Sequence, residues 1–100
     1  MYGRSPKEIK EGIIKITPSL KTYQKDCERI CKIFSRRLKM LKDERSMTLE
    51  EIADTLGISR QSIIYYIMGD RIPKVPILIQ IAKMFGTSVD FLLGVSNKRW

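Results

Sequence analysis

The sequence predicts an all-α fold. Apolar residues recur three and four positions apart along most of the chain, and the strict alternation of a half-buried strand is missing. Glycine and proline stand between the periodic segments, where helices end and begin. The chain has 100 residues, about the length of one domain, and its 43% apolar and 30% charged residues are typical of a folded protein. We therefore expect one helical unit around a single modest core.

The first predicted helix begins at Ser5, with Pro6 in its first turn and Glu8 closing a capping box. One face of this helix carries three isoleucines, Ile9, Ile13 and Ile16. Gly12 lies inside the segment and favours a short helix, because glycine weakens helix interiors.

A second helix is predicted to start at Thr17-Pro18. It carries an apolar stripe at alternating spacings of three and four, namely Leu20, Tyr23, Cys27, Ile30 and Phe34. Two continuations fit the pattern. Either Ser35 caps a new helix with Leu38 and Leu41, or the same helix runs on to about Arg45. In both cases we expect the stripe to be covered, by the rest of the domain or by a second chain.

From Thr48 onward, capping residues and glycines delimit short helices. Thr48 and Glu51 form a capping box, and Gly57 ends that helix in the left-handed conformation that a tight turn needs. The predicted buried face is Ile52, Ala53 and Leu56. Ser59 caps the next helix, Arg60–Met68, which ends at Gly69.

Two more helices and a tail complete the chain. After a loop at Pro73, a helix is predicted over residues 75–85, with Leu78, Ile81, Ala82 and Phe85 facing inward. Gly86 ends it, and Ser88 caps a fifth short helix with Val89, Leu92 and Leu93 folding back onto the core. The tail, residues 95–100, is too short to form a domain.

The charge of the chain is strongly basic and unevenly placed. Nineteen basic and eleven acidic residues give a net charge of +8. Residues 1–45 hold 13 basic and 6 acidic residues, whereas residues 46–100 hold 6 and 5. A small basic domain suits polyanions, nucleic acid before membrane surfaces. The alternative is a basic surface that serves only solubility.

No metal, cofactor or catalytic site is predicted. Cys27 and Cys31 lie one helical turn apart, and the chain has no histidine to complete a zinc site. We expect two reduced thiols in a cytoplasmic protein. No export signal is visible, and the longest apolar run, Val75–Ile79, is far too short to span a membrane. Ser59 and Ser62 are explained by helix capping, so we expect no enzyme.

Two short helices joined by a glycine-led turn are typical of a helix-turn-helix. The stretch from Arg37 resembles the lambda repressor/Cro-like, or XRE, helix-turn-helix family over about residues 36–94. Its agreeing motifs are TLEEIADTLGIS, SRQSI, the loop from Gly69 to Pro73, IAKMFG and SVDFLLG. The resemblance implies a five-helix, repressor-like bundle that binds palindromic operators in double-stranded DNA as a homodimer. We divide the chain into a helical extension (1–34), the DNA-binding domain (35–94) and the tail (95–100).

The resemblance also implies which residues contact DNA. Gln61 matches a position that often reads a base, and glutamine can pair with adenine N6 and N7. Arg60 would take guanine or a phosphate, while Ile64 and Tyr65, both expected to be exposed, offer apolar surface to thymine methyls. Ile63 and Tyr66 match core positions. The full predicted set is Thr48, Ser59, Arg60, Gln61, Ser62, Ile64, Tyr65, Arg71 and Lys74. The alternative for this face is ordinary solvated surface.

Three positions depart from the family pattern. Leu49 replaces a glutamine that helps to hold DNA in many relatives. Ile67 stands where a glutamate often pairs with an arginine near the position of Lys42, so we expect apolar packing in place of that ion pair. Asp70 stands where relatives are commonly basic, and it would weaken nearby phosphate contacts.

These residues predict a sequence-specific transcriptional regulator, most simply a repressor that occupies its operator. The alternative is an antitoxin or adaptor whose extension, residues 1–34, binds a protein partner. For the extension itself we consider a dimer interface, a lid on the domain and a basic arm along DNA. No small-molecule ligand or membrane partner is indicated.

Overall fold

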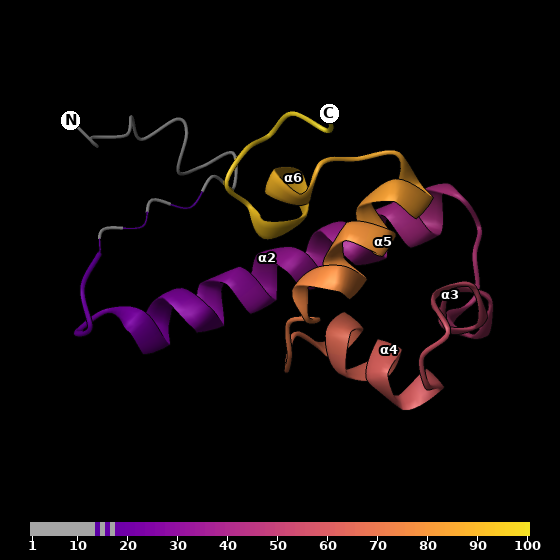
Figure 1. The fold of residues 1–100 in the computed structure, drawn as a ribbon, viewed down its shortest axis with the longest axis horizontal. Helices are drawn as coiled ribbons and strands as arrows, with labels where there is room; N and C mark the ends of the chain where they lie inside the picture. The colour runs from indigo at the N-terminus through magenta and orange to yellow at the C-terminus, as the bar shows by residue number, and fades with distance from the viewer. Residues whose placement is uncertain (1–13, 15, 17) are drawn as a thin grey trace.

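The computed structural model describes residues 14, 16 and 18–100, and within that part it contains five α-helices and no strand (Figure 1). A long helix is followed by four short ones: α2 (Tyr23–Glu44), α3 (Leu49–Leu56), α4 (Arg60–Met68), α5 (Val75–Phe85) and α6 (Val89–Leu93). The predicted all-α fold is confirmed, and the four helices after residue 48 lie where the sequence places them.

The structure decides between the two continuations of the second predicted helix. Helix α2 is one continuous helix through Ser35, whose hydroxyl turns inward and donates to the carbonyl of Ile67 in α4. The predicted start at Thr17-Pro18 is wrong, because α2 begins at Tyr23. A turn precedes it, in which the Ser19 hydroxyl accepts the N–H of Lys21 at 3.1 Å. Local hydrogen bonds of this kind compete with the helical ladder.

The first predicted helix, from Ser5 to Ile16, lies almost wholly outside the described residues. Ile16 has no helical conformation and is 43% exposed. Ile14 is buried, and its N–H donates to the carbonyl of Gly94 at 2.7 Å. This contact joins the segment before α2 to the end of α6.

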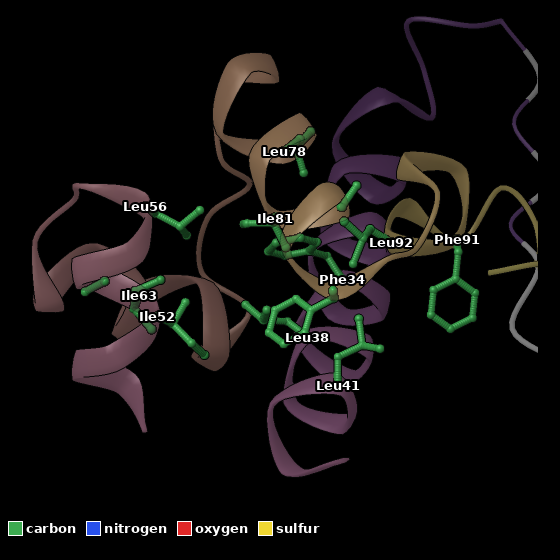
Figure 2. Close-up of a cluster of buried hydrophobic side chains, with 13 residues drawn as sticks. Phe34, Leu38, Leu41, Ile52, Leu56, Ile63, Leu78, Ile81, Phe91 and Leu92 are labelled. Atoms are coloured by element: carbon green, nitrogen blue, oxygen red, sulfur yellow. The ribbon is translucent and has the colours of Figure 1, made fainter. Parts of the chain in front are cut away.

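All five helices supply the hydrophobic core (Figure 2). Its fully buried large side chains are Phe34 and Leu38 of α2, Ile52 of α3, Ile63 of α4, Ile81 of α5 and Leu92 of α6. Each such side chain contributes about 1.5–3 kcal/mol on burial. The core therefore fixes α4 to the remaining helices through Ile63, which determines the face that α4 turns outward.

The apolar stripe that begins α2 is covered only at its C-terminal end. Phe34 is fully buried and Ile30 is half-buried, whereas Tyr23 is 66% exposed and Leu20, ahead of the helix, is 95% exposed. Of the two alternatives, the described part of the domain covers only the C-terminal end of the stripe, and cover by a second chain stays a prediction. The N-terminal half of α2 extends past the short helices, as Figure 1 shows.

Two arginines tie the C-terminal tail to the domain. Arg37 of α2 donates to the carbonyls of Phe91 at 2.5 Å and Ser96 at 2.6 Å, and burial lowers its pKa. Arg99 forms two bonds of 2.9 and 2.6 Å with the carboxylate of Glu44. These bonds hold the pKa of Glu44 below its usual value. Nothing in the sequence pattern indicated that the tail packs in this way.

None of the helices in the described part combines the length and the apolar character that crossing a membrane requires.

Candidate nucleic-acid interface

The N-terminus of α3 is open to solvent and carries a complete capping box. The hydroxyl of Thr48 accepts the N–H of Glu51 at 3.1 Å, and the carboxylate of Glu51 accepts the N–H of Thr48 at 2.9 Å. The exposed amides of such a helix end can bind an anion, because the helix dipole is positive there. Thr48 is exposed, as an anion contact would require.

A tight turn sets the angle between α3 and α4. Gly57 has a φ of +70°, a conformation that side chains disfavour. The N–H of Ile58 returns to the carbonyl of Ala53 at 3.0 Å. Ala53 is only 3% exposed, so the small side chain lets the helices approach closely. The structure thus contains the helix-turn-helix that the sequence predicts.

Helix α4 is capped by Ser59, whose hydroxyl accepts the N–H of Ser62 at 3.1 Å. The two serine hydroxyls are 2.9 Å apart and bond to each other. Ile63 is fully buried, and the ring of Tyr66 packs edge-on against Phe34 with ring centroids 6.2 Å apart. The predicted inward positions are confirmed, and α4 is held with its other face toward solvent.

Two polar side chains at the start of α4 project into solvent. Gln61 is exposed. The guanidinium Nε of Arg60 lies 3.0 Å from a carboxylate oxygen of Glu50 in α3, and both side chains are more than half exposed. This ion pair links the first turns of the two helices, and no local pattern in the sequence predicts it. Solvent screens such an exposed pair, so it orients Arg60 more than it stabilises the fold.

The C-terminal end of the outward face is less exposed than predicted. Ile64 and Tyr65 are half-buried rather than exposed. For Tyr65 the cause is the guanidinium of Arg71, which lies 4.2 Å above the ring centroid. This cation–π contact brings Arg71, from the loop after α4, against the face of α4 that carries Tyr65. The side chain of Lys74, just before α5, is exposed.

Residues 38–92 match the sequence model of a helix-turn-helix family. The match covers more than half of the chain and includes the whole α3–turn–α4 unit. The chain belongs to this XRE-type helix-turn-helix family.

Three relatives illustrate the similarity. The uncharacterized HTH-type transcriptional regulator YqaE of Bacillus subtilis (strain 168) is 37% identical over 68 residues, 67% of this chain and 59% of that protein. The HTH-type transcriptional regulator AnsR of the same organism is 36% identical over 63 residues, 63% and 54% of the two chains. The cryptic phage CTXphi transcriptional repressor RstR of Vibrio cholerae is 28% identical over 65 residues, 65% and 59%.

The chain therefore matches little more than half of the length of each of these relatives. No solved structure matches it significantly.

Two of the positions that we expect to depart from the family pattern, Leu49 and Ile67, lie against the hydrophobic core. Ile67 packs half-buried against the core, and Lys42 lies 3.4 Å from the neighbouring carboxylate of Asp43. The expected apolar packing of Ile67 is confirmed, and its replacement of an ion pair stays a prediction. Leu49 is half-buried and also packs against the core.

The predicted site residues fall into two groups on the helix-turn-helix. The N-terminal group gathers at the first turns of α3 and α4 and consists of Thr48, Ser59, Arg60, Gln61 and Ser62. The second group, Tyr65 and Arg71, lies at the end of α4 and in the following loop. In the described part of the chain, no side-chain hydrogen bond, ion pair or ring contact links Ile64 or Lys74 to either group.

The helix-turn-helix presents hydrogen-bond donors and apolar surface to solvent. In the described part of the chain, no three histidine, cysteine or acidic side chains are grouped so as to hold a metal ion. Both cysteines are free and half-buried on α2, and burial raises the pKa of Cys31. Chemically, the exposed amide, guanidinium and hydroxyl groups can donate hydrogen bonds to bases and phosphates.

Proposed function

We propose that this protein is a transcriptional regulator that binds a specific sequence of double-stranded DNA as a dimer and acts as a repressor. The observation that supports this proposal most directly is the orientation of helix α4, which is anchored by the buried Ile63 and turns Arg60 and Gln61 outward. Such a helix, placed after a short partner helix and a tight turn, fits the DNA major groove. The cytoplasm is the expected compartment.

Gln61 is the residue proposed to specify sequence. Its exposed amide can donate to N7 and accept from N6 of adenine, where it discriminates by about 1–3 kcal/mol against other bases. Arg60 beside it can take guanine O6 and N7 or a phosphate. Ile64 and Tyr65, although half-buried, keep apolar edges for thymine methyls and sugars.

The remaining predicted residues are proposed to bind the backbone and so fix the register of α4 on the duplex. Thr48 and the amides behind it would donate hydrogen bonds to one phosphate at the N-terminus of α3. Ser59 and Ser62 offer hydroxyls at the start of α4, and Arg71 offers a guanidinium already placed by its stack on Tyr65. Lys74 supplies a further exposed charge.

Dimeric, palindromic recognition is proposed from the family, in which the similar RstR is a transcriptional repressor. A symmetric pair of α4 helices would read two half-sites about 10 base pairs apart or a multiple of that spacing.

The test is a selection from randomised duplex DNA at near-physiological salt, with the wild type, Gln61→Ala and Gln80→Ala in parallel. Gln80 is also an exposed helical glutamine, but it lies on α5, so it controls for loss of an amide elsewhere. We expect a two-fold symmetric motif that Gln61→Ala relaxes at one position in each half-site and Gln80→Ala leaves unchanged. Failure of the wild type to enrich any sequence would refute the proposed function.

A further inference from the structure

One face of α2 carries a line of five basic side chains, here called the α2 basic stripe. Its members recur at spacings of four and three and are all exposed: Lys25, Arg29, Lys32, Arg36 and Lys39. The same helix buries Phe34, Leu38 and Leu41 in the core on its other side. The core therefore fixes the direction of the stripe, because a helix cannot turn about its axis without exposing these side chains.

The charge of the stripe is largely uncompensated. Arg29 lies 3.6 Å from a carboxylate oxygen of Asp26, and it is the only one of the five that pairs with a carboxylate within residues 14, 16 and 18–100. The four acidic residues of α2 are divided between its two ends, Asp26 and Glu28 near the start and Asp43 and Glu44 at the end, where Glu44 is engaged by Arg99. A row of like charges held together at the surface is costly unless an anion occupies it.

The α2 basic stripe passes close to the C-terminal end of α4. Cys31 and Ser35 of α2 lie directly beside Gly69, at which α4 ends. Lys32 of the stripe and Asp70 of the loop line the same surface hollow of about 500 Å³. The N-terminal half of α2 then extends beyond the body of the domain (Figure 1). The stripe therefore adjoins the loop that carries Arg71.

The proposed reading surface and helix α2 carry net charges of opposite sign. Residues 48–74, which include α3, α4 and the loop, hold three basic and four acidic residues, a net charge of −1. Helix α2 holds seven basic and four acidic residues, a net charge of +3. Sequence-independent attraction to DNA comes from neutralised phosphates. With a net charge of −1, the proposed reading surface supplies little of that attraction by itself.

We infer that the α2 basic stripe binds phosphates of the DNA duplex next to the site that α4 reads. The inference rests on the proposed function for its geometry and adds to it a second contact surface. From Lys25 to Lys39 the helix rises about 21 Å, which corresponds to about six phosphates along one strand. The stripe supplies affinity without sequence preference, and α4 supplies the preference.

The test compares two double variants of the full chain. Lys25→Gln with Lys32→Gln removes two charges from the projecting half of the stripe. Lys83→Gln with Lys98→Gln removes two exposed lysine charges elsewhere, so both variants carry the same net charge. Fluorescence anisotropy measures the affinity of each for one duplex as a function of salt, and circular dichroism checks that each is folded.

The stripe variant is expected to reduce the slope of log affinity against log salt by about 1.8, since each lost phosphate contact removes about 0.9. When the salt is raised from 50 to 200 mM, the wild type should lose affinity by a factor that is about 12 times larger than the factor for the stripe variant. The control variant should keep the wild-type slope. Equal slopes for all three proteins, or equal losses in both variants, would overturn the inference.

The two proposals fail in different ways. If the wild type binds a specific sequence and the stripe variant keeps its salt slope, the stripe inference is wrong and the proposed function stands. If the wild type binds DNA without sequence preference and the stripe variant lowers the slope, the stripe inference stands and sequence-specific regulation is wrong. A wild type that binds no DNA refutes both.

Discussion

The turn between α3 and α4 predicts the outcome of one substitution, Gly57→Ala. Gly57 adopts a φ of +70°, and a Cβ added there would have no heavy atom within 4 Å. The cost is therefore conformational rather than steric. An alanine in the left-handed region costs about 1–2 kcal/mol. The reduced freedom of the unfolded chain returns about 0.4–1 kcal/mol of that. The free energy of unfolding should fall by about 1 kcal/mol.

A loss of about 1 kcal/mol lowers the midpoint of thermal unfolding of a domain this size by roughly 4–8 °C. Circular dichroism during heating measures this shift. Gly57→Asn is the matched variant, because asparagine tolerates the left-handed region and should lose less than alanine. Below its unfolding transition, Gly57→Ala should bind DNA like the wild type, since nothing obstructs the new methyl group. An unchanged midpoint for Gly57→Ala, or an equal loss with asparagine, would refute the reasoning.

Two further predictions concern ion pairs. Glu50→Gln frees Arg60 and removes a negative charge from the proposed DNA-binding face. The affinity for DNA, measured by fluorescence anisotropy at low salt, should therefore become several-fold tighter, and the free energy of unfolding should change by less than about 1 kcal/mol. Weaker binding would instead mean that Glu50 positions Arg60 for its contact with DNA. Arg99 lowers the pKa of Glu44, so their pair stabilises the fold above the usual carboxyl range and is lost as pH falls through the lowered pKa. Glu44→Gln should thus lower the unfolding midpoint near pH 7 by more than it does once the pH has fallen through the lowered pKa of Glu44, and a shift that stays the same as the pH falls would contradict this.

Sequence alone predicted α3 to α6 because their boundaries depend on local chemistry. Thr48, Ser59 and Ser88 each cap the helix that follows with their own hydroxyl group. The glycines after these helices adopt the left-handed conformation that ends a helix. Both signals act within a few residues, so they can be read from the sequence without knowledge of the tertiary fold.

The errors occur where the structure depends on distant partners or on competing local signals. Two nearby places could start the helix, Thr17-Pro18 and Thr22. A turn at Ser19 intervenes, so α2 begins directly after Thr22. The tail could not be predicted from a pattern, because it is held by Arg37 and Arg99 across more than fifty residues of sequence.

Within the candidate site, the sequence indicated which residues lie on α4 but not how they are constrained. The Arg60–Glu50 pair joins residues ten positions apart that meet only when the turn brings α3 and α4 together. Tyr65 was expected to be exposed because no local pattern places Arg71 over its ring. The residue types thus indicated which chemical groups lie on this surface, whereas the tertiary fold determines which of those groups are exposed and which are held by a neighbouring side chain.

In the proposed function, specificity and affinity reside in different helices. The net charge of −1 over residues 48–74 gives little attraction to non-operator DNA, so contacts from Gln61 account for a larger share of the discrimination. The α2 basic stripe can strengthen binding to every sequence without changing that discrimination, because phosphates carry no sequence information. Substitutions on α2 should therefore shift affinity for operator and random DNA together, whereas substitutions at Gln61 should change their ratio.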